Sequence, residues 1–394
     1  MPDGEDRDTL EGQAVSVLSS LSDIAPEAWD KCAGAENPFL SHAFLSALEE
    51  SGSVTAKTGW LPRHLMIEDA AGTVLGVMPL YLKGHSYGEY VFDWGWADAW
   101  ERAGGRYYPK LLSAVPFTPV TGPRLLVNPE AEREPVEAHL IGGLATLMEQ
   151  LEVSSAHVNF PTASQWERLG EYGFLKRKGL QYHWTNDGYE SFDDFLGALS
   201  SRKRKAIKKE RRKVAETDLN IRCVTGDDLK PEHWDAFYAF YVDTSDRKWG
   251  SAYLTREFFD LLGERMADRV MLVLAEMENM PVAGALNLIG TDTLYGRNWG
   301  CLADFKFLHF EACYYQAIEF AIARGLKTVE AGAQGRHKIQ RGYLPVETYS
   351  NHLIPNQSFR DAISDFLTSE ARQIEAEKTY ILEESPFRQD APQS

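Results

Sequence analysis

In some stretches of the first 175 residues, hydrophobic positions alternate with polar ones, as they do in strands. In other stretches they recur at helical spacing. Glycine-containing turns separate the alternating runs, as in sheets built from hairpins. The predicted strands are 14–18, 64–67, 73–81, 90–94 and 156–160. The predicted helices are one that Ser41 caps and that carries Phe44 and Leu48, and the segments 109–115 and 135–151. This order predicts one α/β unit of about 150 residues.

A second series of the same kind follows in the rest of the chain. Ser191, Pro231 and Thr255 suit the first turns of three helices. Another helical run, 308–324, ends at Gly325, a residue typical of a helix C-terminus. The predicted strands of this series are 270–276, 282–289, 293–299 and 327–331. The chain therefore contains a second predicted α/β unit.

The two series share a sequence pattern. The run VLGVMPL at 74–80 parallels VAGALNL at 282–288, and DWGWADAW at 93–100 parallels NWGCLADF at 298–305. In each series a predicted helix with a Tyr-Tyr pair follows. The alternative is chance recurrence in a Trp-rich chain, but agreement in both residues and order favours duplication.

The composition describes an acidic protein large enough for two domains. The 394 residues are 44% hydrophobic, and the formal net charge of -17 repels nucleic acid except where basic residues gather. Four scattered cysteines lack CxxC spacing, so neither a zinc site nor a disulfide framework is indicated. Residues 1–12 are polar and are expected to form a disordered tail without a signal peptide. Since no apolar run is long enough to cross a bilayer, we expect a cytoplasmic protein.

One segment reverses the overall charge. Residues 202–213 read RKRKAIKKERRK and carry +8, while the rest of the chain carries -25. On one helix face, several of these side chains could neutralise phosphates of tRNA, a nucleotide diphosphate or coenzyme A. The alternative is a solvated helix anchored by Ala206, Ile207 and Val214. The candidate donor-binding residues of this segment are Lys205, Lys208 and Arg212.

An acyl-coenzyme A fingerprint is present only in part. In the pattern Q/R-x-x-G-x-G/A, backbone amides and a helix N-terminus hold the pyrophosphate. The run RNWGCL starts at Arg297 and lies at a predicted strand-to-helix junction, but Leu302 replaces the small final residue that allows close backbone approach. This departure weakens the acyl-coenzyme A interpretation and favours a donor bound partly through side chains.

Several segments resemble the Fem-type transferases. In the span 186–350 they are LSSRKRKAIKKERRK, FYAFYVDTSDRKWGSAYLTREFF, VLAEMENMPVAGALNL and GLKTVEAGAQG. HSYGEYVFDWGWADAW and VPFTPVTGPRLL resemble a Fem-related group described as peptidoglycan biosynthesis or recognition proteins. The resemblance implies an α/β fold with tandem GNAT-like (acyl-CoA N-acyltransferase) domains of mixed sheet. It also implies transfer of an amino acid from aminoacyl-tRNA to an amine of a peptidoglycan precursor.

The resemblance gives the predicted domains their roles. The first GNAT-like domain, 13–175, lies on the acceptor side, and the second, 176–360, carries the basic helix on the donor side. A C-terminal helix and tail occupy 361–394. In the Fem-related pattern, the segment 87–96 belongs to acceptor recognition, where the carboxylates of Glu89 and Asp93 could bind an ammonium or a hydroxyl group.

The segment EAGAQGRHK at 330–338 is the candidate floor of the site, with a surface turn as the alternative. In the Fem-type pattern a lysine shortly after this strand end lies near the reacting centre, and Lys338 matches it. Its ammonium would hold the donor ester or stabilise the oxyanion. Tyr343 could donate a proton to the leaving group, or it could be a buried aromatic residue with its hydroxyl satisfied. Glu330 completes the candidate catalytic set.

Further residues complete the candidate site. Arg256 could contact a phosphate of the donor. Alternatively, it is a charged residue at a helix end that binds no ligand. The added donor-binding candidates are Arg256, Arg297 and Arg341. The added acceptor-binding candidates are Gln334 and His337.

The remaining motifs narrow the chemistry. No GxSxG elbow, HExxH or P-loop occurs, which argues against a covalent hydrolase, a zinc protease and an ATPase. The histidines lack metal-ligand spacing, so no metal is expected. We expect direct transfer in a ternary complex without a tightly bound cofactor, with aminoacyl-tRNA or an acyl-coenzyme A thioester as co-substrate. The alternative from another class is a non-catalytic nucleic-acid or ligand-binding protein.

Overall fold

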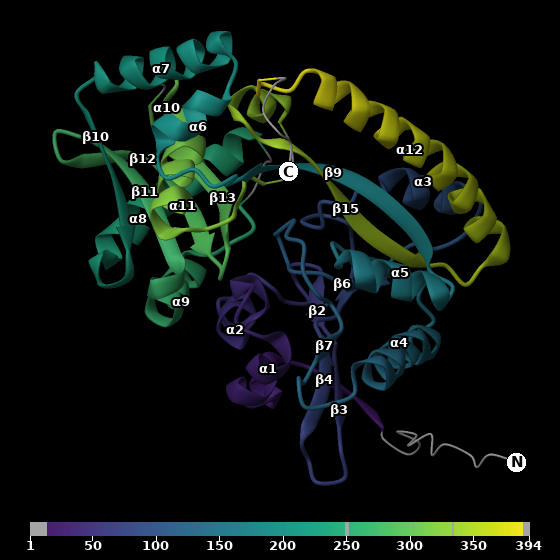
Figure 1. Ribbon diagram of the computed structural model, residues 1–394. Helices are drawn as coiled ribbons and strands as arrows, with labels where there is room; N and C mark the ends of the chain where they lie inside the picture. The colour runs from purple at the N-terminus through teal and green to yellow at the C-terminus, as the bar shows by residue number, and fades with distance from the viewer. Residues whose placement is uncertain (1–13, 249–251, 304, 333–334, 389–394) are drawn as a thin grey trace, which may run out of the picture.

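The computed structural model describes residues 14–248, 252–303, 305–332 and 335–388. The predicted tail at 1–12 and the candidate Gln334 lie outside the described residues. Two α/β halves, which we define as residues 14–174 and 186–343, are joined by two long strands and a long helix (Figure 1).

The first half arranges helices around two groups of strands. The strands are β1 (Val15–Leu18), β2 (Trp60–Pro62), β3 (His64–Glu68), β4 (Val74–Met78), β5 (Tyr81–Lys83), β6 (Lys110–Ser113), β7 (Leu126–Val127) and β8 (Ala156–Asn159). The helices are α1 (Pro26–Ala33), α2 (His42–Glu50), α3 (Trp94–Arg102), α4 (Arg133–Gln150) and α5 (Ala163–Glu171), with the 3-10 turns η1 (Leu21–Asp23) and η2 (Pro38–Leu40). A four-stranded sheet has the order β1-β3-β4-β7, and β8-β6-β5-β2 form one end of an eleven-stranded sheet.

The second half supplies the other end of the large sheet, in the order β10-β11-β12-β13-β14. The strands are β10 (Leu219–Thr225), β11 (Val270–Met277), β12 (Met280–Ile289), β13 (Thr293–Cys301) and β14 (Thr328–Glu330). The helices are α6 (Phe192–Ala198), α7 (Ser201–Ala215), α8 (Pro231–Lys248), α9 (Arg256–Met266), α10 (Leu308–Phe310) and α11 (Gln316–Arg324). Shorter turns are η3 (Gly226–Asp228), η4 (Ala267–Arg269), the π-helical η5 (Glu311–Tyr315) and η6 (Arg336–Arg341).

Two strands are exchanged between the halves. β9 (Leu175–Thr185) follows the first half but pairs with β14, and β15 (Leu344–Leu353) follows the second half but pairs with β8. β9 and β15 also pair with each other in antiparallel register. Helix α12 (Gln357–Glu383) lies along this pair (Figure 1), and Arg177 of β9 donates two hydrogen bonds of 2.7 Å to Glu370 of α12. Each half therefore completes its sheet with a strand from elsewhere in the chain.

The two halves repeat one topology. A parallel pair is present in each, β6 with β8 and β13 with β14. The predicted match of 74–80 with 282–288 stays a prediction. Residues 74–80 contain β4 of the four-stranded sheet, whereas the strand that pairs with β6 as β12 pairs with β13 is β5. The predicted match of 93–100 with 298–305 is wrong, because α3 begins at Trp94 whereas β13 continues to Cys301.

Two elements predicted for the first half are also wrong. Residues 109–115 contain strand β6 rather than a helix. Because β6 is buried throughout, its apolar run does not reveal a strand period. The predicted strand at 90–94 is instead the end of a loop, and Asp93 precedes helix α3. Two carboxylates of this loop, those of Glu89 and Asp93, bind Lys110 of β6.

Ser41 caps α2 as predicted, since its side chain accepts a hydrogen bond from the backbone N–H of Phe44. We expect Ser41→Ala to lower the free energy of unfolding by about 1 kcal/mol, because this N–H loses its acceptor. Urea denaturation measures the change. Ser369→Ala, at an exposed position inside α12, is the control and should change the free energy of unfolding far less. Equal effects of the two substitutions would contradict the capping role.

Candidate functional site at the junction of the halves

Three neighbouring strands bring polar side chains together where β13 and β14 stop pairing. The parallel register ends at Tyr295 and Glu330, and Glu330 lies opposite His183 of β9. The Glu330 carboxylate accepts a hydrogen bond of 3.1 Å from Arg297 Nη2 and lies 3.8 Å from His183 Nε2. Burial lowers the pKa of His183, so the imidazole is neutral at pH 7. The result is a buried polar group at the end of the parallel pair.

Arg297 connects this group to the first half. Its guanidinium lies 4.6 Å from the ring centroid of Phe39 in η2 and 5.3 Å from that of Tyr295. Nη1 donates to the carbonyl of Gly296, whereas the buried Nε has no hydrogen-bond partner among the described residues. The side chain is therefore fixed between the halves by an ion pair and two aromatic rings, with one donor group unused.

Lys338, in η6, is almost fully buried at 2% exposure. Its ammonium donates a hydrogen bond of 2.9 Å to the carbonyl of Gly332. Among the described residues no carboxylate forms an ion pair with it. Its pKa is lowered to about 8, chiefly by burial; Cys313 raises it and the nearby Arg297 charge lowers it. Lys338 therefore carries a positive charge that is not neutralised locally at pH 7.

A cavity of about 200 Å³ adjoins this polar group. Gln181, in its lining, has Oε1 at 3.2 Å from His183 Nε2. The other walls come from the first half and from the elements that join the halves. They are residues 90–92 and Phe160 of the first half, residues 177–180 of β9, residues 348–350 of β15, and Glu370 and Ile374 of α12.

A family model described as FemAB-like, peptidoglycan biosynthesis/recognition, matches residues 20–389. The chain belongs to the FemAB-like family. As a member of this family, the protein is an acyl- or aminoacyltransferase. No curated protein sequence matches the chain.

Solved structures similar to this FemAB-like chain support the same fold. FemX matches with a TM-score of 0.53 at 12% identity, covering 89% of this chain and 100% of FemX. The C-terminal domain of a putative lysylphosphatidylglycerol synthetase from Agrobacterium fabrum matches with a TM-score of 0.52 at 8% identity, covering 89% of this chain and 97% of that domain. Such low identities show the fold alone. The predicted α/β fold with tandem GNAT-like units is confirmed.

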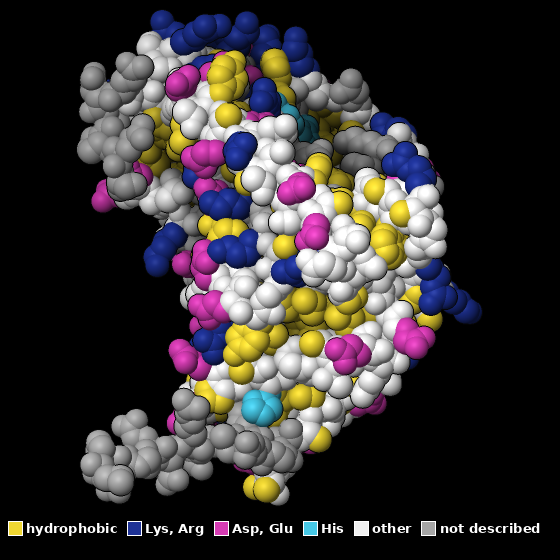
Figure 2. All heavy atoms as spheres, turned by 90° about the vertical axis from the view of Figure 1, so that its right-hand side faces the viewer, with side chains coloured by type: hydrophobic (Ala, Val, Ile, Leu, Met, Phe, Trp, Pro, Cys, Tyr) yellow, Lys and Arg dark blue, Asp and Glu magenta, His cyan; other side chains and the backbone are white. Residues whose placement is uncertain are grey.

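The basic segment of the FemAB-like chain forms helix α7 on the outer end of the second half (Figure 1). Figure 2 shows Lys and Arg side chains gathered at that end. Lys205, Lys208 and Arg212 are exposed and, at spacings of three and four residues, lie along one face. Lys208 pairs with Asp193 at 2.9 Å and Arg212 with Glu216 at 3.7 Å, but both basic side chains remain more than half exposed. Phosphate contact by this face stays a prediction.

The residues that attach the inner side of α7 to the protein are not all those that were expected. Ile207 and Val214 are buried as expected, but Ala206 is exposed. Arg211, which the sequence analysis missed, instead donates bidentate hydrogen bonds to the carboxylates of Glu311 and Glu319. No local pattern distinguishes Arg211 from its basic neighbours, because its partners lie about a hundred residues away in the chain.

The other two arginines of the predicted donor-binding set, Arg341 and Arg256, are also engaged in ion pairs. Arg341 binds both carboxylate oxygens of Glu210, at 2.9 and 3.0 Å, which attaches α7 to η6. Arg256, at the start of α9, pairs with Asp235 at 2.8 Å and with Asp260 at 2.6 Å. If either arginine bound a phosphate directly, its guanidinium would have to contact the phosphate and these carboxylates at the same time.

The remaining candidates of 337–343 have different environments. His337 is exposed, and its Nε2 lies 2.8 Å from the hydroxyl of Tyr314. Tyr343 is fully buried, and its hydroxyl donates to the carbonyl of Tyr314 at 3.5 Å. Burial raises the pKa of Tyr343 well above its usual value. This position matches the alternative of a packed aromatic residue, and a catalytic role for Tyr343 stays a prediction.

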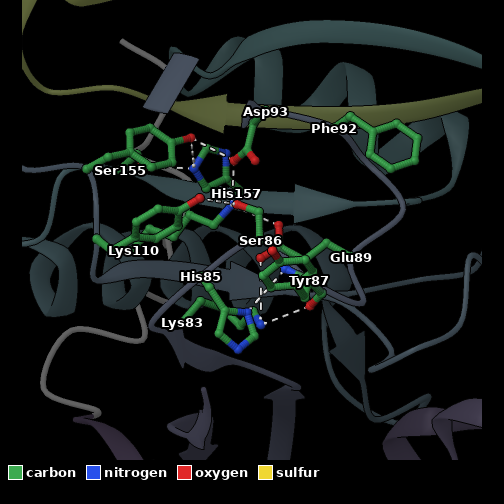
Figure 3. Close-up of polar contacts among 12 residues, drawn as sticks. Lys83, His85, Ser86, Tyr87, Glu89, Phe92, Asp93, Lys110, Ser155 and His157 are labelled. Carbon is green, nitrogen blue, oxygen red and sulfur yellow. Dashed lines mark hydrogen bonds and ion pairs between the residues drawn. The ribbon is translucent and has the colours of Figure 1, made fainter. Parts of the chain in front are cut away.

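The predicted acceptor residues Glu89 and Asp93 lie in a loop of the first half, and both side chains are buried (Figure 3). Both bind the ammonium of Lys110, and Lys83 lies 3.8 Å from Glu89. The sequence analysis missed both lysines, which lie at the end of β5 and the start of β6. A fully buried lysine usually requires a partner. In this arrangement the two carboxylates face the protein interior.

Two features are absent from the described residues. Within them, no group of three or more His, Cys, Asp or Glu residues is arranged to hold a metal ion. No helix among the same residues is long and apolar enough to span a membrane.

Proposed function

We propose that this FemAB-like protein is an aminoacyltransferase that uses aminoacyl-tRNA to form an amide on an amine of a cell-envelope precursor. The nucleophilic nitrogen attacks the carbonyl carbon of the aminoacyl ester, and the bond to the terminal ribose oxygen breaks. The departing oxygen takes up the proton that the amine loses. The supporting observation is the unneutralised Lys338 ammonium at the junction of the halves.

Lys338 stabilises the oxyanion in this proposal. The attack places negative charge on the ester carbonyl oxygen, and a buried cation interacts with it more strongly than an exposed one would. Arg297 lies close enough to lower the Lys338 pKa and has an unused Nε donor. It serves as the second positive group, while Glu330 fixes its orientation. Glu330 therefore acts through Arg297 rather than as the base.

The donor and the acceptor approach from different sides. The exposed basic face of α7 binds the phosphates of the tRNA, and the Glu210–Arg341 ion pair connects this helix to the segment that carries Lys338. The cavity lined by residues 90–92 accepts part of the amine substrate. The family description, peptidoglycan biosynthesis/recognition, supports a peptidoglycan precursor as acceptor. Because aminoacyl-tRNA is present in the cytoplasm, this donor implies a cytoplasmic site of action.

A transfer assay tests the proposal. Purified protein is incubated with a mixture of aminoacyl-tRNAs and a panel of soluble peptidoglycan precursors, and mass spectrometry detects the added aminoacyl group. A parallel reaction contains a panel of acyl-coenzyme A compounds instead of tRNA. Transfer from tRNA supports the proposal. Transfer only from a thioester overturns the donor assignment, and salt-sensitive tRNA binding without any transfer indicates a binding protein.

The pH dependence of transfer tests the charge of Lys338. Because the positive form is the active one, we expect the rate to fall as the pH rises through about 8, the lowered pKa of this lysine. Lys338→Arg keeps its charge at all these pH values and should lose this alkaline decline. The rise at lower pH, where the substrate amine loses its proton, should remain in both proteins. An alkaline decline of the same midpoint in Lys338→Arg would exclude Lys338 as its origin.

A further inference from the structure

Two fully buried lysines lie opposite each other on neighbouring strands. Lys83 of β5 is the register partner of Lys110 of β6, and both are 0% exposed. Like charges in this arrangement repel each other. The loop of residues 84–93, which we name the acceptor loop, supplies the two compensating carboxylates (Figure 3).

Lys110 is the centre of the cluster. Its ammonium donates hydrogen bonds to Ser86 Oγ at 2.7 Å, to Glu89 Oε2 at 2.8 Å and to Asp93 Oδ2. The hydroxyl of Tyr107 also donates to Asp93 Oδ2, at 2.7 Å. The three acceptors of Lys110 span most of the acceptor loop. One side chain of the sheet therefore holds the loop near its beginning, its middle and its end.

The other side of the acceptor loop faces the cavity at the junction of the halves. Residues 90–92 line this cavity. Tyr90 has a left-handed backbone with φ of 59°, which an ordinary side chain rarely adopts without support. The carbonyl of Phe92 accepts a hydrogen bond of 2.9 Å from Arg177 Nη1. The same short segment thus connects the buried cluster to the cavity wall.

Stability alone does not account for this cluster. Buried ion pairs often add no net stability compared with apolar residues of similar volume. Two carboxylate oxygens, Glu89 Oε1 and Asp93 Oδ1, have no hydrogen-bond partner among the described residues. Burial lowers the pKa of Lys83 to about 7 and raises that of Glu89 to about 7, so neither charge is fully compensated. The cluster holds the loop in one conformation although two of its four charges are poorly compensated.

We infer that Lys110 is a positioning residue for the acceptor substrate. Its ammonium fixes the acceptor loop, and the loop fixes the wall of the cavity that residues 90–92 form. The inference rests on the proposed function, because it assigns the cavity to the amine substrate. Glu89 and Asp93 then act through the loop rather than by touching the substrate.

The test uses a variant that removes the charge of Lys110 and those of its two carboxylate partners together. Lys83 remains and can become neutral, since burial lowers its pKa to about 7. Lys110→Met alone would leave two unpaired carboxylates and could unfold the protein, so it is combined with Glu89→Gln and Asp93→Asn, which keep the shape of the cluster. We expect the KM for the acceptor to rise about tenfold, because the freed loop must be ordered again on binding. The KM for the donor and kcat should change by less than about twofold by the same argument. An unchanged acceptor KM in the folded triple variant overturns the inference.

A second measurement separates this inference from the proposed function. Hydrogen exchange should become faster in residues 84–93 of the triple variant, while β13 and α7 keep their protection. This result is expected even if the wild-type protein transfers nothing from tRNA. Arg222→Met combined with Glu276→Gln removes an ion pair of 2.8 Å between β10 and β11 and serves as the control. Unchanged exchange in the acceptor loop, or an equal rise in acceptor KM in the control, would contradict the positioning role.

Discussion

Replacement of Lys338 by methionine is expected to slow transfer about 100-fold without weakening the fold. The buried ammonium faces developing negative charge only in the transition state, so its loss should lower kcat more than it raises either KM. Methionine keeps most of the length and the apolar stem of the lysine. Steady-state kinetics with the donor and acceptor found by the transfer assay measure the effect.

The same substitution should stabilise the folded protein. The pKa of Lys338 falls from its usual value of 10.5 to about 8 on folding, so the folded state binds its proton less tightly than the unfolded state does. Stability therefore rises with pH between these two values, and the penalty is complete below pH 8. Each pKa unit corresponds to about 1.4 kcal/mol, so at pH 7 Lys338→Met could raise the free energy of unfolding by up to about 3 kcal/mol.

The combination distinguishes a catalytic lysine from a structural one. A lysine that only anchors the turn through Gly332 would lower the stability when removed and leave kcat unchanged. Lys327→Met, at a lysine whose side chain is 76% exposed, is the matched control and should change neither property. If Lys338→Met catalyses transfer at the wild-type rate, Lys338 does not stabilise the oxyanion. Arg297 then becomes the residue to test for that role.

Local sequence features predicted the elements whose ends are set by neighbouring residues. Thr255 caps α9 by accepting from the backbone N–H of Phe258, and Gly325 adopts the left-handed conformation with φ of 67° after α11. These features depend on residues within one helical turn, so a sequence pattern is sufficient to find them. The strands β11 to β14 of the second half followed from the same kind of information, whereas β10 (Leu219–Thr225) was not predicted.

Long-range pairing explains what the sequence could not predict. The loop before α3 was predicted as a strand, because its aromatic residues favour strands locally. Its conformation depends on Lys110, which lies 21 residues from Glu89 in the chain. The exchange of β9 and β15 also has no local signature, because the sequence pattern of each strand would be the same if the strand paired within its own half. For that reason His183 was not recognised as a neighbour of Glu330.

Reversal of three charges on α7 is expected to weaken binding of the tRNA donor on the order of 100-fold at physiological salt. The variant carries Lys205→Glu, Lys208→Glu and Arg212→Glu. Each phosphate contact that is lost also lowers the slope of log affinity against log salt concentration by about 0.7 to 0.9. Arg211 is left intact, because its ion pairs with Glu311 and Glu319 hold the helix in place. Fluorescence anisotropy with labelled tRNA at several salt concentrations measures both quantities.

A matched control separates local contact from net charge. Lys57→Glu, Arg133→Glu and Lys327→Glu make the same change in total charge at exposed positions away from α7. Long-range repulsion of tRNA by a more acidic protein would weaken binding equally in both variants, since it depends on net charge. Contact with the helix predicts a large loss and a flatter salt dependence only for the α7 variant. If the two variants bind tRNA equally, the basic face of α7 does not contact the donor, and the phosphate-binding surface must lie elsewhere on the protein.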